Sequence, residues 1–208
     1  MSPDIKEILI ADDGDDEPLE LDVFYPVRFI KLHKRITIGA KRNLLACQAT
    51  GEFICHMDTD DVYHPGYIMY ALNSLKESGK NIFGSSCMLI TFPDKEWKVC
   101  ASVCNDLTKL NEATMVYRKS FWKEGRCGDA SRAEGQYFLK GREDQIFSGD
   151  IHPIMVCIAH GSNTIDKQMW LKNEIPRRVY PVFNHHKKIY RESVCPKQLL
   201  ISHMPPSP

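Results

Sequence analysis

The chain has 208 residues, enough for one substantial hydrophobic core, so we expect a single domain. Its 27 Lys and Arg residues balance 27 Asp and Glu residues, and the formal net charge of zero argues against a nucleic-acid-binding surface or a surface for anionic membranes. The sequence contains no apolar run long enough to span a bilayer and begins without a signal-peptide pattern. It therefore predicts a cytoplasmic protein without a transmembrane segment.

The first part of the chain alternates between strand-like and helix-like segments. Residues 6–13 and 28–32 are short β-branched or apolar runs, and 39–50 has helical composition with one apolar face. The run 53–57 is too apolar to be half exposed, which is typical of a central strand in a covered sheet, and 64–80 reads as a helix. This alternation predicts an α/β sandwich with a largely parallel sheet.

The middle of the chain has a different pattern. Residues 81–93, 97–103 and 113–119 are strand-like runs joined by short links, which indicates an antiparallel or mixed extension of the sheet. A loop rich in glycine and charge follows at 123–136, and 153–160 is one more apolar strand.

The eight cysteines do not form an obvious framework. Cys55, Cys87 and Cys157 lie in apolar strand-like runs, and a chain of this length does not need disulfides for stability. No pair has the spacing of a zinc site. Free buried thiols are the prediction.

Three carboxylates, Asp58, Asp60 and Asp61, follow the strand predicted over 53–57. In extended backbone Asp58 and Asp60 share a face, and together they suit a hard cation such as Mg²⁺ or Mn²⁺. Spacing alone equally allows a solvated acidic turn, with Asp61 as the N-cap of the helix that follows.

Three motifs lie at ordered separations along residues 5–165: ILIADDG at 8–14, IGAKRNLLACQATGEFICHMDTDD at 38–61, and GREDQIF at 141–147. In these the chain resembles the inverting nucleotide-sugar glycosyltransferases of the GT-A fold, including glycosyltransferase domains of multidomain chlorovirus enzymes. The resemblance implies a three-layer α/β sandwich with a central mixed, mostly parallel sheet. One departure is clear, because the family normally has a further strand and helix before the motif at 8–14.

The resemblance also implies a divalent cation, Mn²⁺ or Mg²⁺, at the acidic cluster. It makes Asp60 the direct metal ligand, gives Asp58 a contact to the ribose or the metal, and suggests His160 as a late third ligand. Without the resemblance, a histidine at a strand end is most often a hydrogen-bonded packing residue. His185 and His186, in the basic segment near the C-terminus, are alternatives that read first as surface residues.

The remaining site residues are also implied by the resemblance. Asp12 or Asp13 would accept a hydrogen bond from the uracil ring, Lys41 and Arg42 would reach the diphosphate, and Asp144 would be the general base. Each has an ordinary alternative: an aspartate turn for the first two and a solvated helix face for the others.

These residues lead to one hypothesis and two alternatives. The hypothesis is an inverting transferase that moves a hexose or deoxyhexose from a UDP-sugar to a hydroxyl of a glycan or glycoprotein. The alternatives are a nucleotidyltransferase that makes a nucleotide-sugar and a non-catalytic module that binds sugar or nucleotide. We expect residues 1–110 to bind nucleotide and metal, 111–175 to bind the acceptor, and 176–208 to form a basic segment and tail, with further domains in a longer chain.

Overall fold

The computed structural model describes residues 5–14, 25–161 and 163–173. In the first part of the chain the predicted elements are present, together with one short additional strand. They are β1 (Ile8–Asp12), β2 (Val27–Lys31), α1 (Ile38–Gln48), β3 (Phe53–Cys55), β4 (Val62–Tyr63) and α2 (Tyr67–Ser78). The predicted C-terminal segment 176–208 lies outside the described residues, and so do its two histidines.

The second part contains more strands and two short helices. They are β5 (Ile82–Gly84), β6 (Cys87–Phe92), β7 (Lys98–Val103), β8 (Val116–Arg118), α3 (Lys119–Glu124), α4 (Glu134–Leu139), β9 (Ile146–Ser148) and β10 (Met155–Ile158). The single strand predicted over 81–93 is two strands in different sheets. The chain turns at the buried Ser85, whose backbone N–H donates to Thr114 Oγ1 at 2.8 Å and whose hydroxyl donates to the Gly149 carbonyl at 2.9 Å.

The described strands form three sheets. β1 pairs in parallel with β2, a second sheet has the order β3-β8-β5-β9, and a third has the order β4-β10-β6-β7. The predicted α/β fold with mixed sheets is confirmed, although four of the seven described pairings are antiparallel. Two of the four arise because β8 returns between β3 and β5 and is antiparallel to both, and the other two are β4 with β10 and β6 with β7. As a result β3, predicted to be central, lies at an edge of its described sheet and is only partly buried.

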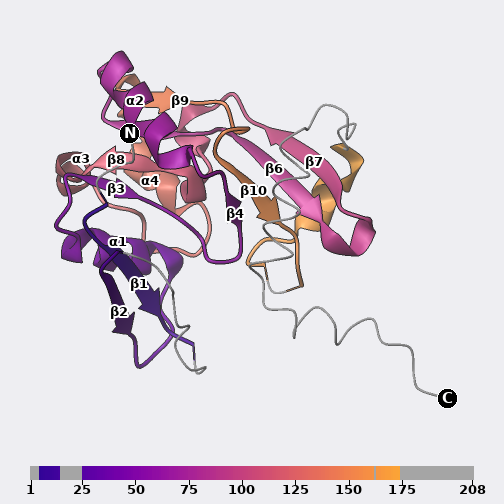
Figure 1. The fold of residues 1–208 in the computed structure, drawn as a ribbon, viewed down its shortest axis with the longest axis horizontal. Coiled ribbons are helices and arrows are strands. Elements are labelled where there is room, and N and C mark those ends of the chain that lie inside the picture. Colours follow the sequence, from indigo (N-terminus) through magenta and orange to yellow (C-terminus); the bar gives the residue numbers. More distant parts are fainter. Residues whose placement is uncertain (1–4, 15–24, 162, 174–208) are drawn as a thin grey trace.

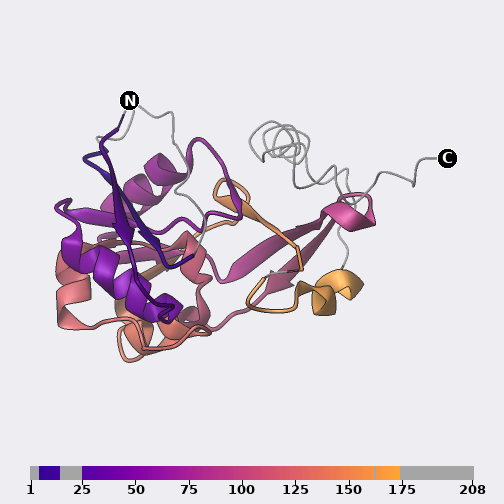
Figure 2. The ribbon, with the colours of Figure 1, turned by 90° about the horizontal axis from the view of Figure 1, so that it is seen from below.

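Two large apolar clusters hold the second and third sheets and their helices together. In the first, Tyr67, Ala71 and Leu75 follow one another at four-residue spacing on α2 and pack against the strands. In the second, the Phe138 ring meets the rings of Tyr117 and Phe121 edge to face, at centroid distances of 5.0 and 5.1 Å. Figure 2 shows β6 and β7 extending from the main body, with the 3-10 turn η5 (Lys167–Asn173) beside β7.

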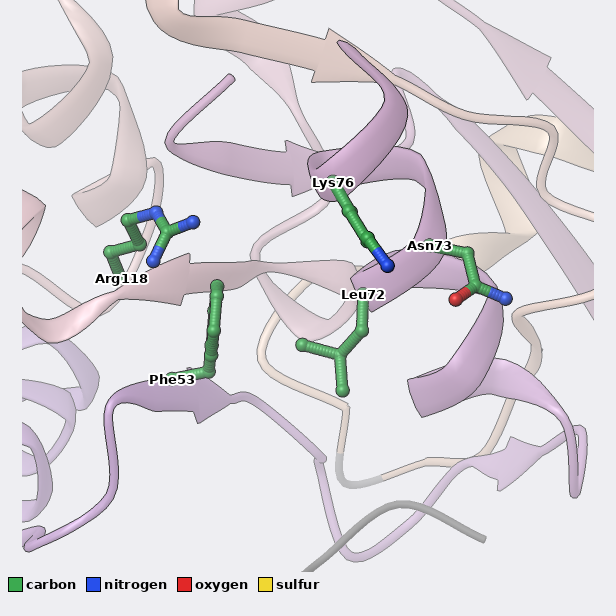
Figure 3. Close-up of a pocket in the computed structure, with 5 residues that line it drawn as sticks. All are labelled: Phe53, Leu72, Asn73, Lys76 and Arg118. Atoms are coloured by element: carbon green, nitrogen blue, oxygen red, sulfur yellow. The ribbon is translucent and has the colours of Figure 1, made fainter. Parts of the chain in front are cut away.

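The strand directions define two opposite ends of the second sheet. Cys55 at the end of β3 pairs with Val116 at the start of β8, so the chain before β8 lies at the carboxyl end of β3. The amino end of β3 carries a pocket of about 280 Å³ between the strand and α2. Its lining residues are Phe53, Leu72, Asn73, Lys76 and Arg118 (Figure 3), and none of them is a predicted site residue. No helix in the described residues is long and apolar enough to cross a membrane.

Candidate active site

The acidic cluster follows β3 at the carboxyl end of the sheet, where it was predicted (Figure 1). Its loop is held by Tyr63, because the backbone N–H of Asp58 donates to the Tyr63 hydroxyl at 2.8 Å and that hydroxyl donates to the Ala113 carbonyl at 3.1 Å. The first acid of the cluster is therefore fixed to the segment that precedes β8.

Asp60 and His160 lie side by side although 100 residues separate them in the sequence. His160 Nε2 is 2.8 Å from Asp60 Oδ2, and the two side chains are 33% and 45% exposed. Asn163 Nδ2 lies 3.3 Å from the same carboxylate oxygen and 2.7 Å from His160 Nε2. The structure thus brings two of the predicted metal ligands into direct contact, with both side chains partly exposed.

These two donors fit part of a coordination sphere for Mn²⁺ or Mg²⁺, which accept carboxylate, imidazole and phosphate ligands. Among the described residues, no group of three or more His, Cys, Asp or Glu side chains could hold a metal ion by itself. A cation at this point would therefore take its remaining ligands from substrate oxygens or water.

Asp58, the other predicted ligand, faces the guanidinium of Arg42. Arg42 Nη2 lies 3.1 Å from Asp58 Oδ1, and Arg42 Nε lies 3.0 Å from Glu134 Oε1. Burial by itself would lower the pKa of Arg42, but the two carboxylates outweigh it and raise that pKa. The Arg42 side chain is only 10% exposed. It lies beside the acidic cluster, and the contacts of its guanidinium are to carboxylates, so its role toward a diphosphate stays a prediction.

The predicted uracil and diphosphate residues gather near the carboxyl end of β1 and the start of α1. Asp12 Oδ1 accepts from the Gly14 backbone N–H at 2.9 Å, which is the ordinary aspartate turn. Asp13 Oδ1 lies 2.6 Å from Lys41 Nζ, and its other oxygen accepts from the Ile36 backbone N–H at 3.2 Å.

Hydrogen bonding lowers the pKa of both aspartates, from the Gly14 backbone for Asp12 and from Lys41 for Asp13. Both side chains are therefore anionic acceptors at neutral pH. Their roles toward a nucleotide stay predictions.

Asp144, the predicted general base, lies at the opposite end of the sheet. It is an exposed residue of the 3-10 turn η4 (Glu143–Gln145) that leads into β9, and β9 runs parallel to β5 from its amino end. Its backbone carbonyl accepts a hydrogen bond from Lys80 Nζ, just before β5. Along the strand direction, at least four residues, roughly 13 Å, separate Asp144 from the acidic cluster. The structure does not bring Asp144 together with the other predicted site residues.

The rest of the motif at 141–147 has a structural role. Arg142 stacks on the ring of Phe121 with its guanidinium carbon 3.4 Å from the centroid, and its Nη2 lies 3.3 Å from Glu124 Oε2. Glu143 accepts from the Gly141 backbone N–H at 3.0 Å. These contacts attach the turn to α3, on the side away from the acidic cluster.

One further prediction is corrected by the contacts. Asp61 is not a helix cap: α2 begins at Tyr67 with Gly66 as its N-cap, and Asp61 Oδ1 accepts from the Ile158 backbone N–H of β10 at 3.0 Å.

The three tryptophans take part in packing. Trp97 and Trp170 are partly buried against the core, and Trp122 is 4% exposed, with its Nε1 donating to Asn43 Oδ1 at 3.0 Å. The described cysteines are free, as predicted, but of the three named in the strand-like runs only Cys157 is buried, while Cys55 and Cys87 are partly exposed.

Sequence reasoning missed three residues at this end of the sheet: His56, Glu112 and Glu134. His56 Nδ1 lies 3.0 Å from the Glu112 carbonyl and His56 Nε2 lies 2.9 Å from the Tyr117 hydroxyl, while burial and the charge of Arg42 lower the pKa of His56 to about 3. Glu134 lies in the loop predicted over 123–136, where an isolated acid carries no periodic signal. Its contact with Arg42 spans 92 residues.

Solved structures share this fold. The chain is similar to the crystal structure of S. aureus TarS 1–349, with a TM-score of 0.50, 13% sequence identity, and coverage of 73% of this chain and 51% of that one. For S. aureus TarS 1–349 in complex with UDP, the TM-score is 0.53 and the identity 14%, with coverage of 74% and 51%. The chain thus spans about half the length of TarS 1–349.

The sequence was also compared with protein families and curated sequences. No curated protein sequence matches the chain. The family model described as Glycosyl transferase family 2, however, matches residues 2–138, which include the acidic turn after β1, all of α1, the DTDD cluster and Glu134. With the GT-A type fold and this match over more than half of its length, the chain belongs to glycosyl transferase family 2.

Proposed function

We propose that this glycosyltransferase is metal-dependent and inverting, and that it moves a hexose or deoxyhexose from a UDP-sugar to a hydroxyl of a glycan or glycoprotein. The observation that carries the proposal is the contact between Asp60 and His160 at 2.8 Å beside the loop of Asp58. Two chain segments 100 residues apart place a carboxylate oxygen and an imidazole nitrogen next to each other, and both side chains are partly exposed. A solvated acidic turn would not need such a partner.

Asp60 and His160 would hold Mn²⁺ or Mg²⁺, with Asp58 held close by Arg42 as a further contact to the metal or the ribose. When bound, the cation would stabilise the negative charge of the leaving diphosphate as a Lewis acid. The protein's own part is to orient these donors. The hydrogen bond from the Asp58 backbone N–H to the Tyr63 hydroxyl fixes the loop. The contact of Asn163 Nδ2 with Asp60 Oδ2 orients the carboxylate of Asp60.

The nucleotide would lie along the start of α1, between the turn after β1 and the acidic cluster. Asp12 and Asp13 are anionic acceptors there, which suits a ring N–H of uracil, and Lys41 beside Asp13 supplies positive charge near a diphosphate. The TarS structure in complex with UDP supports UDP as the nucleotide. The chain spans about half of TarS 1–349, and we propose that it belongs to a longer chain with further domains. We also propose a cytoplasmic location. The glycan or glycoprotein acceptor is likewise part of this proposal.

Calorimetric titration of UDP tests the proposal. Wild-type protein should bind UDP in the presence of Mn²⁺ and much more weakly in EDTA. Asp60→Ala should lose at least about tenfold in affinity, the equivalent of one good ligand contact of roughly 1.4 kcal/mol. The matched control is Asp94→Ala, since Asp94 is an exposed acid in the turn between β6 and β7. Equal binding in Mn²⁺ and EDTA, or an unchanged affinity in Asp60→Ala, would contradict the metal assignment.

A further inference from the structure

Two glutamates stand beside the first acid of the DTDD cluster. Arg42 joins Asp58 to Glu134 through contacts of 3.1 and 3.0 Å. Next to Glu134, the backbone N–H of Gly135 donates to Glu112 Oε1 at 3.3 Å. The carboxyl group of Glu112 is therefore one residue away from the Arg42 network.

A second, independent connection returns from Glu112 to the cluster. The Ala113 carbonyl accepts from the Tyr63 hydroxyl at 3.1 Å, and the same hydroxyl accepts from the Asp58 backbone N–H at 2.8 Å. Both routes link Asp58 with the segment of Glu112, so the contacts form a closed ring. Glu112 is thus held at the same end of the sheet as the acids proposed to handle the donor.

The space for the Glu112 side chain exists because residue 135 is a glycine. A Cβ atom at Gly135 would lie 2.7 Å from Glu112 Cγ, 2.8 Å from the flexible end of Met115 at Cε, and 3.1 Å from Glu112 Oε1. A larger residue at this position would force the carboxyl group to move. The close approach of α4 and the Glu112 carboxyl therefore depends on this one glycine.

The carboxylates of the ring differ in their chemistry. Those of Asp58 and Glu134 are bound to the guanidinium of Arg42, and Glu134 is 4% exposed. Glu112 is partly exposed and forms no ion pair within the described part of the chain. Burial, followed by the nearby charge of Glu134, raises the pKa of Glu112. A carboxylate with a raised pKa is a better proton acceptor, and one without an ion pair is available to act.

We infer that Glu112 is the general base of the transfer; this inference rests on the proposed function. In the reaction, the acceptor hydroxyl oxygen forms a bond to the anomeric carbon of the donor. The bond from that carbon to the β-phosphate oxygen breaks, and its electron pair leaves with UDP. The hydroxyl proton passes to the carboxylate of Glu112, which becomes a neutral carboxylic acid.

The test measures UDP release from UDP-glucose, UDP-galactose and UDP-N-acetylglucosamine with Mn²⁺, using the full chain and water in place of the acceptor hydroxyl. Glu112→Gln keeps the shape and can still accept from Gly135, but it cannot take a proton. Release should slow by about 10²- to 10⁴-fold, the usual contribution of a general base. UDP affinity by calorimetry and the thermal midpoint should stay close to wild type. The matched control is Glu52→Gln, whose exposed carboxylate pairs with Arg118 at the amino end of β3.

A second variant tests the position rather than the charge. Gly135→Ala leaves the Glu112 carboxylate intact but pushes it aside, so UDP release should fall while UDP binding is kept. Full release in Glu112→Gln, or its loss together with UDP binding and stability, would overturn the inference. If Asp144→Asn loses UDP release while Glu112→Gln keeps it in full, the inference is overturned and Asp144 is the general base. Wild-type protein that neither binds UDP nor releases it would overturn the proposed function along with the inference.

Discussion

Removing Arg42 should destabilise the protein strongly, because Arg42 neutralises a buried carboxylate. The side chains of Arg42 and Glu134 are 10% and 5% exposed, and their atoms lie 3.0 Å apart. Removing one partner of a buried ion pair costs roughly 3–5 kcal/mol, since the other charge is left without compensation. Asp58 is 39% exposed, so its share is screened by solvent and adds about 1 kcal/mol at most. We expect Arg42→Met to cost about 4 kcal/mol.

The cost should depend on pH, and the sign follows from Glu112. Burial and then the charge of Glu134 raise the pKa of Glu112, whereas Arg42 lowers it. Without Arg42 this pKa rises further above its unfolded value, so the folded variant holds the proton more tightly. A raised folded pKa stabilises the fold at low pH and loses that contribution as pH increases. Arg42→Met should therefore lose more stability at pH 8 than at pH 5.5.

Urea unfolding followed by circular dichroism at both pH values measures this effect. For a chain of this size, a loss of about 4 kcal/mol corresponds to a decrease in thermal midpoint of roughly 10 °C. The double variant Arg42→Met with Glu134→Gln should recover much of the loss, because the uncompensated charge is gone. Arg132→Met serves as the control, since Arg132 is exposed. A loss below about 1 kcal/mol without pH dependence would refute the reasoning.

Two further predictions concern stability and can be checked by the same unfolding measurement. Gly39→Ala should lower the free energy of unfolding by more than about 3 kcal/mol, because its Cβ would lie 1.8 Å from the Gly128 carbonyl oxygen and the backbone would have to shift. Gly161→Ala is the control, since nothing lies within 4 Å of its Cβ, and it should change stability little. Equal stability of these two alanine variants would contradict the packing. Tyr117→Phe should cost about 1–3 kcal/mol, because it leaves the buried Nε2 of His56 without its hydroxyl partner at 2.9 Å. A neutral result would mean that water or another group replaces that partner.

Local patterns in the sequence were sufficient for the elements that carry the motifs. The helix at 39–50, the strand before DTDD and the helix that follows are all present, because each depends on periodicity and on residues a few positions apart. These elements also place Asp58 and Asp60 after the end of a strand and Lys41 in the first turn of a helix. The resemblance to a family added His160, which the fold brings next to Asp60.

The direction and order of the strands could not be derived in this way. The run 81–93 has continuous strand composition, yet it divides between two sheets at Ser85, whose partners Thr114 and Gly149 are far away in the sequence. The strand at 53–57 is apolar enough for a central position, but β8 covers only one of its edges in the described sheet. Both outcomes depend on segments that meet only after folding.

What the sequence determined by itself is which acids exist and which local elements carry them. Which of these acids share one end of the sheet was decided by tertiary structure alone. Asp144 and Glu112 both lie in polar 3-10 turns, and no local pattern separates them. Because β8 is antiparallel to β3 while β9 is parallel to β5, the turn before β8 lies beside the DTDD cluster and the turn before β9 lies at the far end. The physical reason is that strand pairing joins backbones from distant parts of the chain, and its direction determines which side chains meet.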